Sequence, residues 1–313
     1  MTENDTSCPL FHAAVEDFQQ DPLHQNAERR DTFSSNAGIA KDYDESRPLY
    51  GDDAFELIWK QCGLTELRQP SIFEVGPGTG QATLPMLKKG AKVVACEKSE
   101  FMVRQLKEKV GQWMKETNTG SGSPLQDRFA VLCKSVEECD GNELNGCLWH
   151  AFDVVAAFTS LHWVTPPGLR ILHKVLKPNG WLVAAYHLRN ENGQPCKQLW
   201  DLTRLFAPEK ERRFNSLSID MKAALCEQLM KGSSIFTHVQ SALIPYEHHY
   251  KDPIDFWKYL CTLSYIRSLP QEKLSELKAI VQSYLSEQGI QGVTEQGSIL
   301  LLFAQPSAPC KAE

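Results

Sequence analysis

Short apolar runs alternate with amphipathic helical patterns between residues 71 and 187, and this alternation constrains the fold more than any other feature. The fourth run is continuously apolar, which is typical of a strand buried on both faces of a parallel sheet. Parallel strands need crossover connections, and these are right-handed. The pattern therefore predicts a doubly wound α/β sheet. The five predicted strands are Ser71–Val75, Lys92–Glu97, Arg128–Lys134, Phe152–Phe158 and Trp181–His187.

The alternation stops beyond residue 188. Gln194–Lys231 has helical spacing without a strand candidate, so we interpret it as a helical cap. Two further strands are predicted, Thr237–Tyr250 and Ser298–Ala304, with helices over Pro253–Ile266 and Pro270–Gln288 between them. The expected segments are a polar arm (1–32), a helical lid (33–68), the α/β core (69–187), the cap (188–235), a C-terminal part completing the sheet (236–306) and a tail (307–313).

Composition excludes several classes of protein. The 313 residues carry 33 Lys and Arg against 39 Asp and Glu, a net charge of −6, so a nucleic acid partner is not expected. No apolar run reaches the roughly 18 residues of a membrane span, and the first residues do not read as a secretory signal, so we expect a cytoplasmic protein. The ten cysteines contain no C-x-x-C pair; we expect them reduced and mainly structural, with no metal site.

A glycine-rich turn follows the first predicted strand and runs into a helix. Gly76, Gly78 and Gly80 alternate, which allows the backbone to approach a bound molecule, and the helix N-terminus supplies unpaired N–H groups. The next strand ends at Glu97, 17 residues after Gly80. A carboxylate there can accept hydrogen bonds from both hydroxyls of an adenosine ribose. The pair predicts an adenosine-containing cofactor.

The glycine spacing distinguishes two such cofactors. Nicotinamide sites favour G-x-G-x-x-G, whereas here the third glycine comes one residue early and Glu74 precedes the loop. Glu74–Gly80 resembles motif I of the class I S-adenosylmethionine-dependent methyltransferases, in which the loop lies against the amino-acid portion of the cofactor. The resemblance implies a seven-stranded, Rossmann-like methyltransferase fold with a helical cap.

Further segments carry the same resemblance in order. Phe158–Trp163, with its His-Trp pair, and Tyr43–Tyr50 resemble segments of a subfamily that includes trans-aconitate-type methyltransferases, and Leu176–Gly180 matches the turn before strand five. Tyr43, Arg47 and Tyr50 lie in a segment that is expected to fold over the cofactor, with Arg47 facing its carboxylate. The cofactor-binding residues that the resemblance implies are Tyr43, Arg47, Glu74, Gly76, Gly78, Thr79, Gly80, Glu97, Lys98, Met102, Ser135, Val136, Phe158 and Thr159.

Methyl transfer would need an acceptor and, for a hydroxyl or amine, a base. His162 is the candidate base, with a pocket-wall role as its alternative. The candidates for binding a small-molecule acceptor, with an acidic one favoured and O-methylation expected, are Trp163, Arg204, Tyr265 and Arg267. Two other hypotheses stay open: a protein of this fold that binds the cofactor without transferring methyl, and a nicotinamide-dependent reductase. The oligomeric state is not predicted.

Overall fold

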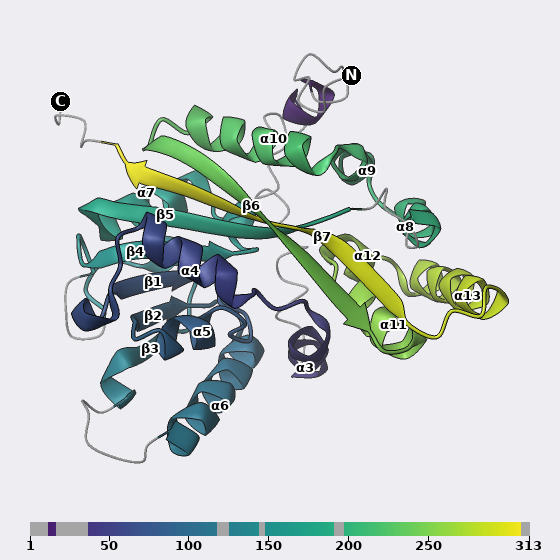
Figure 1. Ribbon diagram of the computed structural model, residues 1–313, viewed down its shortest axis with the longest axis horizontal. Helices are drawn as coiled ribbons and strands as arrows, with labels where there is room; N and C mark the ends of the chain where they lie inside the picture. Colours follow the sequence, from purple (N-terminus) through teal and green to yellow (C-terminus); the bar gives the residue numbers. More distant parts are fainter. Residues whose placement is uncertain (1–11, 17–36, 118–124, 144–147, 191–196, 308–313) are drawn as a thin grey trace. The chain divides into compact units, whose positions relative to one another are not determined.

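The computed structural model describes residues 12–16, 37–117, 125–143, 148–190 and 197–307. Most of the predicted polar arm and the tail from residue 308 lie outside these ranges. Within them the chain forms the alternating strands and helices shown in Figure 1.

Seven strands form one sheet in the order β3-β2-β1-β4-β5-β7-β6. The four pairings from β3 to β5 are parallel, which confirms the predicted doubly wound, mostly parallel sheet. The described strands are β1 (Ser71–Val75), β2 (Lys92–Cys96), β3 (Phe129–Leu132), β4 (Phe152–Phe158), β5 (Leu176–Arg189), β6 (Phe236–Tyr250) and β7 (Val293–Pro306).

Helices connect and follow these strands. The α-helices are α3 (Ala37–Ser46), α4 (Asp52–Gln61), α5 (Thr83–Lys88), α6 (Glu100–Thr117), α7 (Pro166–Val175), α8 (Lys197–Arg204), α9 (Glu209–Ser216), α10 (Ile219–Gly232), α11 (Pro253–Cys261), α12 (Ser264–Arg267) and α13 (Gln271–Glu287). Short 3₁₀ turns are η3 (Glu66–Arg68), η4 (Leu125–Arg128), η5 (Val136–Glu138) and η6 (Leu161–Trp163).

Three predicted elements differ from the structure. The last strand, expected over Ser298–Ala304, extends over Val293–Pro306. The helix expected over Pro253–Ile266 is broken, because Leu263 adopts an extended conformation (ψ 127°) and the Thr262 hydroxyl donates to the Tyr259 carbonyl. Strand five begins at Leu176 rather than Trp181: Leu176 pairs with Phe152 and Trp181 with Val154. Between these pairs, one residue on β4, Asp153, thus opposes four on β5, and the three extra residues bulge around Pro178, which has no N–H for the ladder.

The chain divides into two compact units. The first, here called the glycine-loop unit, comprises Leu49–Tyr186, Glu227–Ile244 and Leu300–Glu313. The second, here called the helical unit, comprises Met1–Pro48, His187–Cys226 and Pro245–Ile299. This division cuts across the linear segments predicted from the sequence. Each unit is described by itself below.

The core of the glycine-loop unit lies along β1 and β4. Val154, Val155, Ala156 and Ala157 are each at most 1% exposed, as the continuously apolar run predicts for a central strand. In the helical unit, a separate apolar cluster gathers residues of α8, α11, α12 and α13 around Trp200, Phe256 and Tyr259. The Trp200 and Phe256 rings meet edge to face at 5.8 Å.

A carboxylate ties the segment after β3 to helix α7. Glu137, in η5, accepts hydrogen bonds on Oε1 from the backbone N–H (3.0 Å) and the hydroxyl (2.8 Å) of Thr165. Thr165 is also the N-cap of α7, where its hydroxyl accepts from Gly168. The position of η5, and of Ser135 and Val136 at its start, therefore depends on Glu137.

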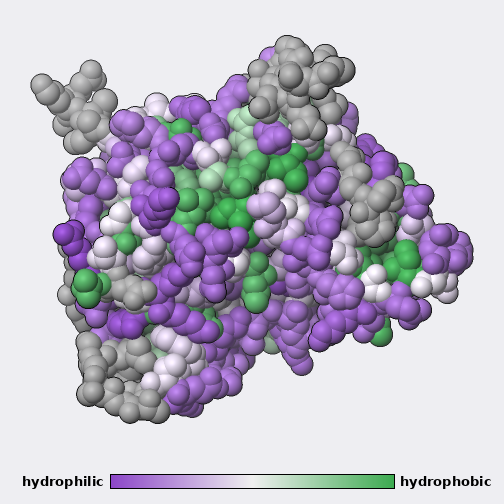
Figure 2. Space-filling view, in the orientation of Figure 1, coloured by the Kyte–Doolittle hydropathy of each residue, from purple (hydrophilic) through white to green (hydrophobic). Residues whose placement is uncertain are grey.

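Polar side chains cover most of the coloured surface seen in Figure 2. Large exposed apolar residues of the described part, such as Leu49 and Leu67, are few. None of the helices that the structure describes has the length and hydropathy needed to cross a membrane.

Replacing Glu137 tests the link between η5 and α7. Glu137→Ala removes two accepted hydrogen bonds, so we expect the free energy of unfolding to fall by about 1–3 kcal/mol in urea titrations. Glu116→Ala is the control, because the Glu116 carboxylate accepts from exposed Gln112 on the surface of α6; its loss should stay below about 0.5 kcal/mol. Equal losses in the two variants would contradict the link.

Candidate functional site

The glycine-rich loop lies at the carboxyl end of β1, in the glycine-loop unit. Gly76 and Gly78 have φ +59° and Gly80 has φ +91°, conformations that residues with a side chain rarely adopt. A Cβ at Gly76 would lie 2.7 Å from the Ser160 Cβ, and one at Gly80 would lie 2.6 Å from the Leu106 Cδ1. Gly76 and Gly80 are therefore required by packing inside the protein as well as by backbone conformation.

Glu97 connects this loop to the end of β2. Its carboxylate accepts hydrogen bonds from the Gly78 N–H at 3.1 Å and from the Ser99 N–H at 2.9 Å. Burial raises the pKa of Glu97, while the N–H groups of Ser99, Gly78 and Lys98 oppose this effect. The structure thus brings the predicted ribose-binding acid and the glycine loop into direct contact.

Glu74 lies inside the protein. It is 0% exposed, and the Thr83 hydroxyl donates to its Oε2 at 2.6 Å. Its Oε1 has no hydrogen-bond partner among the described residues. Burial raises the pKa of Glu74 to about 8; the bond from Thr83 lowers it and the nearby Glu97 carboxylate raises it. Near neutral pH the side chain is therefore largely a neutral acid that joins β1 to α5.

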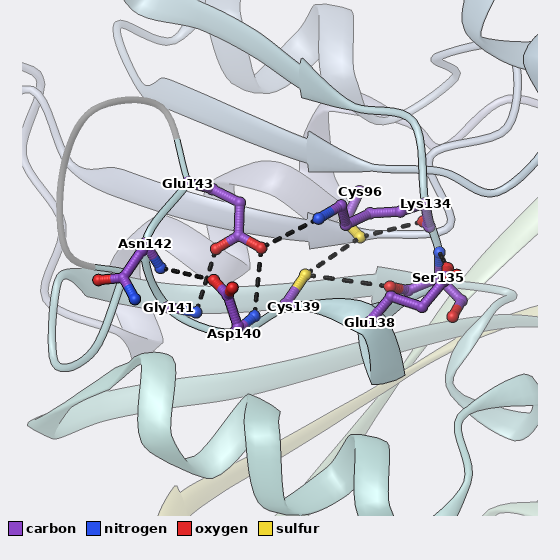
Figure 3. A network of polar contacts seen from close by, with 9 residues as sticks. All are labelled: Cys96, Lys134, Ser135, Glu138, Cys139, Asp140, Gly141, Asn142 and Glu143. Atoms are coloured by element: carbon purple, nitrogen blue, oxygen red, sulfur yellow. Dashed lines mark hydrogen bonds and ion pairs between the residues drawn. The ribbon is translucent and has the colours of Figure 1, made fainter.

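The segment between β3 and residue 143 carries Ser135 and Val136, and a polar network holds it (Figure 3). Glu143 accepts from the Lys134 ammonium (3.2 Å), the Asp140 N–H (3.2 Å) and the Gly141 N–H (3.1 Å). Because Glu143 bonds to residues before and after η5, it holds the backbone around Val136 in place.

Sulfur contacts attach the same segment to the end of β2. The Cys96 thiol donates to the Lys134 carbonyl (3.3 Å), and its sulfur lies 3.9 Å from that of Cys139. Both thiols are buried and free, as expected for structural cysteines. Val136 is buried here, and Met102 is buried at the start of α6, where its N–H reaches the Ser99 hydroxyl at 3.4 Å.

The segment after β4 contains Phe158 and Thr159. The Phe158 ring meets the edge of the Tyr50 ring at 4.7 Å. The Thr159 and Tyr50 hydroxyls share a hydrogen bond of 2.7 Å, and Thr159 has φ +52°. The sequence argument placed Tyr50 in the segment expected over the cofactor, but it did not predict the bond with Thr159, which lies 109 positions away in the chain.

His162 and Trp163 lie in η6, which follows directly. Their ring centroids are 4.6 Å apart, and the His162 ring lies 5.8 Å from that of Tyr186 near the carboxyl end of β5. The structure thus brings His162 and Trp163, which follow the carboxyl end of β4, together with Tyr186 near the carboxyl end of β5. Sequence reasoning missed Tyr186, although its place at the end of a predicted central strand was a usable signal.

Two predicted cofactor residues belong to the helical unit. Arg47 donates from Nη2 to the Thr262 carbonyl at 2.6 Å, and its guanidinium lies 4.9 Å from the centroid of the Tyr43 ring. These contacts join Tyr43 and Arg47 to each other and to α11. Their cofactor role stays a prediction.

The remaining predicted acceptor residues also lie in the helical unit. Arg204 forms an ion pair with Asp201 at 2.8 Å in α8. Tyr265 is 6% exposed within the apolar cluster, and burial lowers the pKa of Arg267 at the end of α12. These observations describe the surroundings of the three side chains within the protein. Their roles in binding an acceptor stay predictions.

The sequence argument also missed a buried polar cluster in the helical unit. Tyr246 donates to Glu295 Oε1 at 2.6 Å, and Arg189 donates to the Tyr259 hydroxyl at 3.1 Å. Among the described residues, Glu295 Oε2 and the hydroxyl of Tyr250 have no hydrogen-bond partner. Burial raises the pKa of Glu295. No local motif marks these residues, because they come from different elements.

Comparison with known families decides the class of the site. A family model described as a methyltransferase domain matches residues 73–182, which include the glycine loop, Glu97 and η6. Residues 73–182 are therefore similar to a methyltransferase domain. This confirms the resemblance seen in the sequence, whereas the trans-aconitate-type subfamily stays a prediction.

The curated proteins that this chain resembles are distant relatives. An uncharacterized methyltransferase of Schizosaccharomyces pombe is 24% identical over 244 residues, 76% of this chain and 82% of that protein. A probable dimethyladenosine transferase of Caenorhabditis elegans is 32% identical over 87 residues, which are 28% of this chain and only 22% of that protein. A putative antibiotic-pathway methyltransferase structure from Anabaena variabilis has a TM-score of 0.53 at 14% identity, covering 83% of this chain and 99% of that one. It supports the fold.

The role of Gly78 in cofactor binding can be tested by comparison with Gly63, a glycine of similar backbone conformation. Gly63 has φ +63° and open space around its Cα, so Gly63→Ala introduces the same backbone strain away from the loop. We expect Gly78→Ala and Gly63→Ala each to lose about 1 kcal/mol of unfolding free energy. Calorimetry should show weaker S-adenosylhomocysteine binding only for Gly78→Ala. Unchanged affinity in that variant would remove the loop from the site.

The buried acid Glu74 predicts a pH dependence of stability. Because its folded-state pKa is raised from 4.5 to about 8, the stabilising neutral form is fully present at low pH and is lost as pH rises through about 8. The free energy of unfolding should therefore fall by up to about 1.4 kcal/mol per pH unit from this group between about pH 5 and 8. Glu74→Gln should flatten that part of the profile in urea titrations at several pH values. A profile parallel to that of the wild type would contradict the assignment.

Proposed function

We propose that this methyltransferase transfers the methyl group of S-adenosylmethionine to an oxygen atom, a carboxylate or a hydroxyl, of a small molecule. The contact between Glu97 and Gly78 carries the proposal. It places a carboxylate that can bind ribose hydroxyls 3.1 Å from the backbone nitrogen of the glycine loop. The net charge of −6 further disfavours a nucleic acid as acceptor.

The residues fit this cofactor chemically. Glu97 offers carboxylate oxygens to two ribose hydroxyls, and the left-handed glycines let the backbone approach without side chains. Val136 and Met102, which the resemblance places beside the cofactor, are buried apolar residues of the kind that an adenine ring packs against. The sulfonium supplies an already activated methyl group, so the protein's work is to orient the acceptor and to exclude water.

His162 has one of two roles, depending on the acceptor. A hydroxyl must lose its proton during transfer, and an imidazole is the side chain best suited to accept it near neutral pH. A carboxylate already presents a lone pair and needs only hydrogen-bond donors. The ring contacts of His162 with Trp163 and Tyr186 hold its plane in both cases.

Binding and transfer measured separately test the function. The wild-type chain should bind S-adenosylhomocysteine by calorimetry and should incorporate tritium from methyl-labelled S-adenosylmethionine into the low-molecular-mass fraction of a cell extract. Binding without incorporation would favour the non-transferring alternative. Binding of NADH in place of S-adenosylhomocysteine would favour the reductase.

The two roles of His162 are separated by two substitutions. If His162 is the base, His162→Ala and His162→Gln should both lower kcat by about 10²- to 10⁴-fold with S-adenosylhomocysteine affinity unchanged. If it is an anchor, the Gln variant should recover most of the rate, because its amide keeps a hydrogen bond but takes up no proton. His150→Ala, at an exposed turn, serves as the control and should keep the wild-type rate.

A further inference from the structure

Thr159 has a strained backbone directly after β4. Among the described non-glycine residues with positive φ, which are Gln69, His150, Thr159, Ser234 and His238, it is the β-branched one. A β-branched side chain in the left-handed region is an outlier that persists only where the surroundings impose it, and such outliers concentrate at functional sites.

Three bonds impose this conformation. The Thr159 N–H donates to the Ala185 carbonyl of β5 at 2.7 Å. The next residue, Ser160, donates its hydroxyl to the Val75 carbonyl of β1. The Thr159 hydroxyl is held by the phenol of Tyr50 at 2.7 Å. Two of these restraints come from the sheet, whereas Tyr50 is the only one of the three that acts on the side chain.

Tyr50 is well suited to hold a neighbour in place. It is 9% exposed, and its ring is fixed edge-on against Phe158 at 4.7 Å. The Phe158 ring is in turn stacked on Phe55 of α4 at 5.6 Å. The phenol oxygen therefore has little freedom to follow Thr159 if the threonine relaxes.

The sheet order places this pair relative to the cofactor. Glu97 follows β2, the glycine loop follows β1, and Thr159 follows β4, with β1 between β2 and β4. If Glu97, after β2, binds the ribose, the rest of the cofactor extends across the glycine loop after β1. Its amino-acid end then lies on the side of β4. Ser160 lies close to the glycine loop there, since its hydroxyl donates to the Val75 carbonyl and a Cβ added to Gly76 would come within 2.7 Å of the Ser160 Cβ.

We propose that Tyr50 is a positioning residue, which holds Thr159 in its left-handed conformation so that Thr159 binds the amino-acid end of S-adenosylmethionine. A hydroxyl has one donor and two acceptor sites, so the bond with Tyr50 leaves the Thr159 oxygen able to accept from the cofactor ammonium. This inference rests on the proposed function for its ligand.

Two ligands distinguish a role of Tyr50 at the amino-acid end of the cofactor from a general effect of Tyr50 on cofactor binding. S-adenosylhomocysteine carries the amino-acid portion, whereas 5′-methylthioadenosine carries the adenosine and thioether without it. Tyr50→Phe keeps the ring and removes the hydroxyl. We expect it to weaken S-adenosylhomocysteine binding by about 3- to 10-fold and to leave 5′-methylthioadenosine binding unchanged.

Variants of Thr159 complete the test. Thr159→Gly relieves the strain, so its urea midpoint should not fall, yet its affinity for S-adenosylhomocysteine should drop as in Tyr50→Phe. Thr159→Ser keeps the hydroxyl and should stay near wild-type affinity. The control is Tyr284→Phe, which removes a phenol bonded to Gln198 in the helical unit and should leave both affinities unchanged.

The outcomes are distinct. Undiminished S-adenosylhomocysteine binding in Tyr50→Phe, or equal losses for both ligands, would overturn the role of Tyr50 while leaving the methyltransferase function intact. A wild-type chain that binds neither ligand would overturn the proposed function itself.

Discussion

The hydrogen bond from the Gly78 N–H to the Glu97 carboxylate is the contact on which the site depends. It joins the turn after β1 to the turn after β2, two segments that parallel pairing already brings side by side. A hydrogen bond from a backbone N–H to a carboxylate oxygen is strong, and burial strengthens it further by excluding competing water. The carboxylate that is proposed to bind the ribose therefore also holds the glycine loop in the conformation in which a ligand can approach its backbone.

Buried acids recur in both units, with different consequences. Glu74 has one bonded and one unpartnered oxygen among the described residues, and its neutral form avoids the cost of an isolated charge. Glu295 in the helical unit has the same pattern, with Tyr246 as its donor. Glu97 differs because backbone N–H groups compensate its carboxylate. These N–H donors favour the ionised form of Glu97 and oppose the effect of burial, which still raises its pKa.

The sequence pattern predicted those parts of the fold that depend on residues close together in the chain. The bounds of β1 and β4 agree with the apolar runs from which they were expected, since burial on both faces leaves little choice of residue. Glu97 could be predicted because its partner lies in the adjacent turn. The pairing of Tyr50 with Thr159 could not, because it joins residues 109 positions apart and depends on how α4 meets the sheet. Spacing along a helix likewise says nothing about which residues Arg47 or Tyr265 contact.

The bulge in β5 divides this strand into two parts that pair with β4 in different registers. Before it, Leu176 pairs with Phe152; after it, the register runs without further shift from Trp181 opposite Val154 to Ala185 opposite Phe158. A change in chain length near the exposed Pro178 and Asn179 would be absorbed by the bulge, and the register beyond it would be kept. Tyr186, next to Ala185, would keep its place beside His162. The start of this strand can therefore change in length while its carboxyl end keeps its register against β4.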